Sequence, residues 1–222
     1  PKADADDDDD GRARRGGGGG AVGGWTGEAE AEAPPSLEDV GTSLLKVKAE
    51  AWATRAAGWS ELGSFLRGDR AAEVQPYLEK VTTTLLDKLA DPHYKVVTAA
   101  MHCAAALVEA YPHAVEATLE RLLPQLLLRA HDTRDATRAA ARAAVGAVGG
   151  GYPSESLAPV VMRVLDSSNP KVKAAALELL SQVAPSAVGY LSTPAHVRSC
   201  VAKVLPGAAD KNADVKRAAV AA

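Results

Sequence analysis

Apolar residues recur every three or four positions along most of the chain from Leu37 onward. This spacing places them on one face of an α-helix. One such face consists of Leu119, Leu122, Leu123, Leu126 and Leu127. No segment has the strict alternation of apolar and polar residues that a half-buried β-strand requires. The pattern therefore predicts an all-α fold.

Proline and glycine interrupt this periodicity and separate the predicted helices. Such breaks occur at Asp91-Pro92, Tyr111-Pro112, Gly149–Gly151 and Asn169-Pro170, where loops are expected. The predicted helices are 37–46, 52–67, 74–90, 94–110, 113–130, 134–148, 154–166, 170–184, 194–207 and 213–222. We expect them to pair into about five hairpins, of which the last is incomplete.

A motif of one aspartate, then valine or threonine, then an Ala-Ala pair occurs four times. The aspartates are Asp91, Asp132, Asp166 and Asp210. They are about 40 residues apart, and each unit is rich in leucine before the aspartate and in alanine after it. This pattern is typical of HEAT or armadillo repeats, in which helical hairpins stack into an α-solenoid. Such a protein presents an edge of the stack to a partner.

The first 36 residues have low complexity and form a separate region. They include the runs Asp6–Asp10 and Gly16–Gly20, and they offer too little apolar surface to offset the entropy of folding. We predict a disordered linker over 1–36 and a repeat domain over 37–222. The linker has nine acids and four bases, a charge of −5, which leaves +2 for the repeat domain within the net −3. Because nucleic-acid binders are usually strongly basic, we expect no nucleic-acid partner.

Other features limit the classes of function. The sequence has no run of 18 uncharged apolar residues, so we expect no membrane span. Cys103 and Cys200 lie in different repeats, which favours buried, reduced thiols in a cytosolic chain. The histidines lack metal-ligand spacing, and the sequence has no phosphate loop or nucleophile elbow. We therefore expect no catalytic residue, no metal and no cofactor. Because the chain begins at Pro1 and stops inside a helical pattern at Ala222, we interpret it as part of a longer protein.

Basic residues stand at the turn inside each predicted hairpin. They are Lys46, Lys48, Lys95, Arg134, Lys171, Lys173, Lys211 and Lys216. Stacking would align these turns along one edge and make a basic ridge. Several lie at helix starts, where the free N–H groups also favour an acidic partner. The alternative is that these side chains only keep the surface soluble.

Trp52 stands at the start of the second helix of the first hairpin. An exposed tryptophan at a turn is typical of an interface anchor. The alternative is a core position on the same stripe as Ala56, Trp59 and Leu66. We favour the interface for Trp52 and assign Trp59 to the core.

An ordered set of motifs over 37–222 resembles the TOG domains of CLASP-type microtubule regulators. The motifs are Trp52-x-x-Arg55, Asp91-Pro92-His93-Tyr94-Lys95-Val96, Leu119-Glu120-Arg121-Leu122-Leu123-Pro124, Ser154-Glu155-Ser156-Leu157-Ala158-Pro159, Asn169-Pro170-Lys171-Val172-Lys173 and Asp210-x-Asn212-x-Asp214-Val215-Lys216. Ciliary proteins with TOG arrays are also similar.

The resemblance implies a flat paddle of HEAT repeats that binds αβ-tubulin, free or in the microtubule lattice, through its intra-repeat turns. The implied tubulin-binding residues are Trp52, Lys95, Arg134, Asn169, Lys171, Lys211, Asn212 and Lys216. The tryptophan would pack on β-tubulin, and the basic residues would face acidic tubulin surface. The implied location is the microtubule cytoskeleton of the cytoplasm, or the axoneme if the protein is ciliary.

Two other functions remain open at this point. One is a HEAT-repeat scaffold in a cytoskeletal or axonemal assembly, without affinity for free tubulin. Joint exposure of Trp52 and the basic turns on one edge would favour tubulin binding over this role. The other is an enzyme on a similar scaffold, such as an alkyl-purine DNA glycosylase. That enzyme would need a concave basic channel lined by aromatics, which this sequence does not offer.

Overall fold

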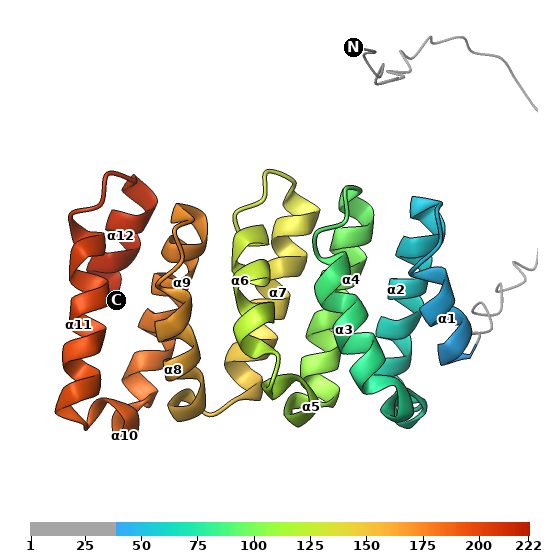
Figure 1. The fold of residues 1–222 in the computed structure, drawn as a ribbon, viewed down its shortest axis with the longest axis horizontal. Helices are drawn as coiled ribbons and strands as arrows, with labels where there is room; N and C mark the ends of the chain where they lie inside the picture. The colour runs from blue at the N-terminus through green and yellow to red at the C-terminus, as the bar shows by residue number, and fades with distance from the viewer. Residues whose placement is uncertain (1–38) are drawn as a thin grey trace, which may run out of the picture. The chain divides into compact units, whose positions relative to one another are not determined.

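The computed structural model describes residues 39–222, and every regular element in that range is a helix. The hairpins follow one another in a row, as an α-solenoid does (Figure 1). This confirms the all-α solenoid that the sequence predicts. The predicted linker over 1–36 lies outside the described residues. No helix in the described range is long and apolar enough to cross a bilayer.

Each hairpin pairs a first helix, sometimes broken, with a second helix, which is the longer of the two in the first four hairpins. The helices are α1 (Val40–Lys46) with α2 (Trp52–Arg67); η1 (Ala71–Tyr77) and α3 (Leu78–Lys88) with α4 (Tyr94–Ala110); α5 (Pro112–Glu116) and α6 (Leu119–Arg129) with α7 (Asp135–Gly151); α8 (Ser154–Val164) with α9 (Pro170–Val183); and, after η2 (Ala184–Ser186), α10 (Val188–Leu191) and α11 (Pro194–Ala208) with α12 (Ala213–Ala221).

The turns inside the hairpins all lie along one edge of the stack, the upper edge in Figure 1. We call this edge the turn edge. It comprises 47–51, 89–93, 130–134, 165–169 and 209–212, together with the first turn of each helix that follows. The short elements α5 and α10 lie at the opposite edge. The alignment that the repeat period predicts is therefore present.

The core is mainly aliphatic, with Trp59 and Phe65 as its largest buried side chains. The second helices pack on each other in the order α2, α4 and α7. Buried alanines such as Ala104 and Ala144 lie on these helices, and small side chains let helices approach closely. Trp59 is fully buried, as predicted.

Two Tyr-Pro pairs join neighbouring repeats at the edge opposite the turns. The Tyr111 hydroxyl donates to the carbonyl oxygen of Ala71 at 2.9 Å, and the Tyr152 hydroxyl donates to that of Pro112 at 2.6 Å. Each bond spans 40 residues, about one repeat. These tyrosines therefore help to fix the position of one repeat on the next. The sequence analysis had predicted only breaks between helices at Tyr111-Pro112 and Pro153.

The predicted loop at Gly149–Gly151 is wrong, because α7 continues through all three glycines. The helix ends instead at Tyr152, which has extended dihedral angles of −127° and 143°. Tyr152 precedes Pro153, and the residue before a proline avoids the helical region. A β-carbon at Gly149 or Gly150 would meet nothing within 4 Å, so neighbouring groups do not impose glycine there.

Two predicted first helices are broken. The segment predicted as 74–90 begins as the 3-10 helix η1, which contains Pro76, and becomes α-helical only at Leu78. The segment predicted as 113–130 is divided into α5 and α6. Proline lacks a backbone donor, which accounts for the break near Pro76.

The packing of second helices changes between the third and fourth hairpins. Helix α9 packs on α6 and α8, and the close pairing that joins α2, α4 and α7 is not continued from α7 to α9. A cavity of about 260 Å³ lies there, lined by residues that include Leu127, Val145 and Leu179. Figure 1 shows the same separation between α7 and α9. The first three hairpins thus form one packed group, and the last two form another.

Candidate functional site

Aspartates close three of the turns on the turn edge. Asp91 Oδ1 accepts the N–H of His93 at 2.9 Å, Asp132 Oδ1 accepts that of Arg134 at 3.0 Å, and Asp210 Oδ1 accepts that of Asn212 at 2.8 Å. A carboxylate that bonds the N–H two residues on makes an Asx turn. The repeated aspartate therefore shapes the loop that leads into each second helix.

Asp166 does not play this part in the fourth turn, contrary to the predicted repeat. There Ser167 Oγ accepts the N–H of Asn169 at 3.2 Å, while Asp166 accepts Lys203 Nζ at 2.6 and 2.7 Å. Val172 is five residues after Ser167 but six after Asp166, whereas the other aspartates precede their equivalent residue by five. This spacing identifies Ser167 as the equivalent position.

The first two turns are joined by an ion pair between Arg55 and Asp91. The Arg55 Nε and Nη2 atoms lie 2.9 and 3.0 Å from the two Asp91 carboxylate oxygens. Arg55 Nη1 also donates to the carbonyl oxygens of Ala49 and Glu50 in the first turn. The side chains are only 12% and 3% exposed. Arg55 therefore fixes the first turn to the second.

The hydrogen bonds of these turns also set the ionisation of the aspartates. Burial by itself raises the pKa of Asp91, but the Arg55 guanidinium and the N–H of His93 outweigh it and hold the pKa below its usual value. The N–H of Arg134 and the Arg129 guanidinium lower the pKa of Asp132 in the same way, against the effect of burial. Both carboxyl groups are thus held in the charged form.

Three aromatic rings form a stack across the first two turns. The Trp52 and His93 rings are 4.0 Å apart at an angle of 11°, and the His93 and Tyr94 rings are 5.3 Å apart at 22°. We call Trp52, His93 and Tyr94 the aromatic stack. Trp52 is 41% exposed, which places it on the turn edge and not in the core.

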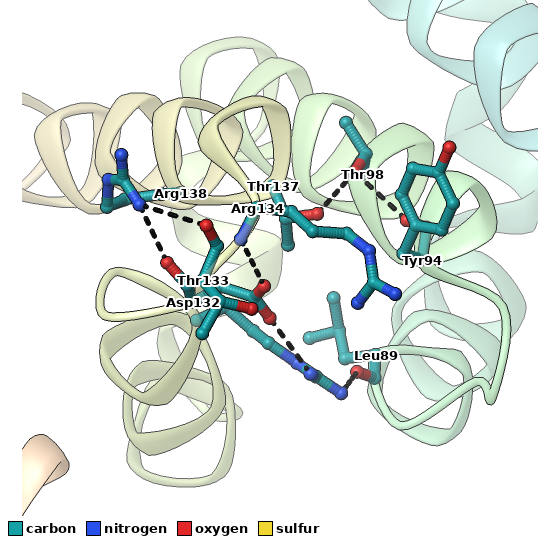
Figure 2. Close-up of polar contacts among 9 residues, drawn as sticks. Leu89, Tyr94, Thr98, Asp132, Thr133, Arg134, Thr137 and Arg138 are labelled. Atoms are coloured by element: carbon teal, nitrogen blue, oxygen red, sulfur yellow. Dashed lines mark hydrogen bonds and ion pairs between the residues drawn. The ribbon is translucent and has the colours of Figure 1, made fainter. Parts of the chain in front are cut away.

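A cation lies against each end of the aromatic stack. Lys95 Nζ is 5.0 Å from the centre of the Trp52 ring, and the Arg134 guanidinium carbon is 4.6 Å from that of Tyr94. Figure 2 shows Arg134 extending from the start of α7 toward Tyr94 on α4. Contacts of this kind are attractive at short range. The sequence analysis assigned Trp52, Lys95 and Arg134 to three separate turns as tubulin-binding residues. In the structure they lie around one aromatic stack.

His93 and Tyr94 were not among the nominated site residues. His93 lies 41 residues after Trp52 and 41 before Arg134, the same interval that separates Asp91 from Asp132. Equivalent positions in successive repeats stack next to each other in a solenoid. The repeat period is therefore the signal that could have found His93.

Most acidic side chains of the turn edge form ion pairs within the molecule, whereas Glu50 and Asp210 form none with a described residue. The pairs are Asp91 with Arg55, Asp132 with Arg129, Asp135 with Arg138, Asp166 with Lys203 and Asp214 with Arg217.

Most basic residues of the edge form no ion pair with any described residue. They are Lys48, Lys95, Arg134, Lys171, Lys173, Lys211 and Lys216. Lys46 differs, because its Nζ lies 2.7 Å from Glu61. The edge therefore has an excess of unneutralised positive charge.

The fourth and fifth turns contribute lysines and two asparagines. Asn169 Oδ1 accepts the N–H of Lys171 at 3.0 Å, and Asn212 Oδ1 accepts the N–H groups of Asp214 and Val215 at 2.9 and 3.3 Å. Both asparagines thus cap the helices α9 and α12, which occupies the side-chain oxygen. Their amide nitrogens donate no hydrogen bond to a described residue, so they are available to a partner.

No hydrogen bond or ion pair joins the third turn to the fourth within residues 39–222. The nominated residues Lys171, Lys211 and Lys216 are exposed on the same edge as the aromatic stack, but they form a second group. In the same described range, no group of three His, Cys, Asp or Glu side chains could hold a metal ion.

Comparisons with known proteins agree on the kind of domain. The family model described as "CLASP N terminal" matches residues 41–221. A CLIP-associated protein of Arabidopsis thaliana is 29% identical over 195 residues, which is 85% of this chain and 14% of that protein. The chain thus spans about a seventh of this relative's length.

Two solved structures are similar in fold. The MAST/Orbit N-terminal domain is 18% identical, with a TM-score of 0.63 over 82% of this chain and 81% of that one. A structure from work on how TOG–tubulin binding specificity promotes microtubule dynamics and mitotic spindle formation is 18% identical, with a TM-score of 0.64 over 82% of this chain and 69% of that one. At these identities the likeness establishes the fold alone.

Proposed function

The chain belongs to the CLASP N-terminal family, and on that premise we propose that it is a TOG-type module that docks αβ-tubulin on its turn edge. Through this contact the parent protein regulates microtubule dynamics or stability. The module works by binding, and we propose no catalytic activity. Its place of action is the microtubule cytoskeleton of the cytoplasm. A ciliary placement has no support from the relatives described above.

One observation carries this proposal: Trp52 and the unpaired cations of the turn edge are exposed together on one side of the stack. An exposed tryptophan supplies apolar contact area and is typical of the residues that dominate binding energy. The cations complement an acidic protein surface and speed its encounter. This joint exposure is the feature that favours tubulin binding over the scaffold role.

The site residues have different proposed roles. Trp52 packs on the tubulin surface, while Lys95 and Arg134 contact carboxylates on either side of it. Lys171, Lys211 and Lys216 contact further acidic groups, and Asn169 and Asn212 donate from their amide nitrogens. Linked modules raise the effective concentration of a partner. The affinity of this module alone can therefore be modest in a parent protein with several tubulin contacts.

Reversing two charges on the turn edge should weaken tubulin binding. We expect Lys171→Glu/Lys216→Glu to raise the dissociation constant for αβ-tubulin about tenfold at low salt, because each exposed cation contributes up to about 1 kcal/mol. The difference should shrink at high salt, since salt screens exposed charges. Analytical ultracentrifugation of the chain with soluble tubulin measures both effects.

The matched control is Arg121→Glu/Arg198→Glu, which changes the net charge equally. Both arginines are exposed and lie near the starts of α6 and α11, at the end of each helix away from the turn edge. This variant should bind almost as wild type does. Equal weakening in both variants would mean that net charge alone drives association. A folded wild-type chain that binds neither tubulin nor microtubules would favour the scaffold role.

A further inference from the structure

The imidazole of His93 lies between the rings of Trp52 and Tyr94, and its polar atoms do not explain its presence there. His93 Nδ1 is buried and has no hydrogen-bond partner among the described residues. Leaving a polar atom buried without a partner costs free energy. The ring contacts its neighbours through its flat face instead, by stacking on Trp52 and Tyr94. The ring of His93 therefore serves the site through stacking.

The helix start that carries Trp52 has little support of its own. Ala51 is the N-cap of α2, and no side chain caps that end. Trp52 is the first residue of the helix and is substantially exposed. A large ring in this position has freedom to change rotamer unless another element holds it.

The second turn supplies that support at two points. Arg55, one helical turn after Trp52, binds the carboxylate of Asp91. The same carboxylate accepts the N–H of His93, whose ring stacks on Trp52 at 4.0 Å. Trp52 and Arg55 on α2 are thus held by His93 and Asp91 on the second turn, which fixes the tryptophan relative to α4 as well as to its own helix.

The charges around the aromatic stack define the surface that it fits. Lys95 and Arg134 lie at its two ends, while Asp91 and Asp132 of the same turns are bonded to Arg55 and Arg129. A matching partner surface has an apolar contact point with a carboxylate on each side. Such a surface meets the stack in register only if the Trp52 ring keeps a fixed position.

We propose that His93 is a positioning residue that holds Trp52 in the orientation that docks on the acidic partner surface, without contacting the partner itself. This inference rests on the proposed function, because the partner is tubulin. Ordering a side chain before binding reduces the entropy lost on association. Loss of the His93 ring therefore weakens binding even though Trp52 and every cation remain.

The test compares His93→Ala with His93→Phe, which keeps a flat ring. The first readout is acrylamide quenching of Trp52 fluorescence in a Trp25→Phe background, where the other tryptophan, Trp59, is buried. The second is the dissociation constant for αβ-tubulin. We expect His93→Ala to increase quenching and to raise the dissociation constant about three- to tenfold, the worth of one aromatic pair. His93→Phe should restore both values to within about twofold of wild type.

His113→Ala is the matched control, because the His113 side chain is 97% exposed on α5, at the opposite edge. It should leave both readouts unchanged. The proposal is overturned if His93→Ala quenches as wild type does, if it loosens Trp52 without changing the affinity, or if His93→Phe fails to rescue. A wild-type chain that binds no tubulin would overturn the proposed function, while the quenching still decides whether His93 holds the ring.

Discussion

Replacing Trp52 by alanine should raise the dissociation constant for αβ-tubulin by about 30-fold or more, the effect typical of an aromatic hot spot. Trp52 combines apolar area with exposure on the turn edge, and His93 already holds its ring in place. Alanine removes that area and leaves Lys95 without the ring that its ammonium group contacts. Isothermal titration calorimetry with soluble tubulin measures the change.

The fold should tolerate this substitution, because the side chain is not part of the core. We expect the thermal midpoint of Trp52→Ala to stay close to that of wild type. Trp52→Phe keeps a ring on His93 and should lose less affinity than Trp52→Ala. An alanine variant that is folded and binds tubulin as wild type does would remove Trp52 from the site.

Replacing Asp91 by alanine should lower the free energy of unfolding by about 3 to 5 kcal/mol, because it leaves the guanidinium of a buried ion pair without its partner. Arg55 is almost fully enclosed and would keep only its bonds to two carbonyl groups. The N–H of His93 would also lose its acceptor. Urea denaturation followed by circular dichroism measures the loss.

The control for this substitution is Asp135→Ala. Asp135 also pairs with an arginine, Arg138, but its side chain is 89% exposed, and surface pairs are worth at most about 1 kcal/mol. A loss of stability in Asp91→Ala no larger than in Asp135→Ala would contradict a structural role for the buried pair.

The same ion pair should make stability depend on pH at the acid end. The pKa of Asp91 in the folded chain is below its ordinary value of 3.8. A depressed folded pKa contributes stability that is present above the unfolded pKa and is lost as pH falls through the folded one. The difference in stability between wild type and Asp91→Asn should therefore be largest above about pH 4 and shrink below it.

The helices and their order could be predicted from sequence because they depend on local periodicity and on proline. The spacing of the leucines gives the buried faces, and Pro92, Pro112 and Pro170 mark helix starts. The loop predicted at Gly149–Gly151 was wrong, because glycine weakens a helix without forcing it to end. The proline that follows, at position 153, decides where α7 stops.

The site could be predicted only in part, because its key contacts join residues about one repeat apart. The turn positions of Trp52, Lys95 and Arg134 follow from the repeat and the family resemblance. Whether their side chains meet depends on how one turn stacks on the next. The repeat period places His93 next to Trp52, but the stacking of their rings emerges only when the hairpins are placed side by side. The same holds for the ion pairs that join Asp91 and Asp166 to Arg55 and Lys203 of neighbouring hairpins.

The most direct test of the central claim is to map which edge of the solenoid touches tubulin. A photoreactive phenylalanine derivative would replace Lys48, Ser168 or Ala209 on the turn edge, or Ala114 or Pro185 near the opposite edge; all five are exposed. After irradiation with αβ-tubulin, we predict tubulin adducts from the three turn positions and none above background from the other two. Adducts of equal yield from both edges, or only from the opposite edge, would contradict docking on the turn edge.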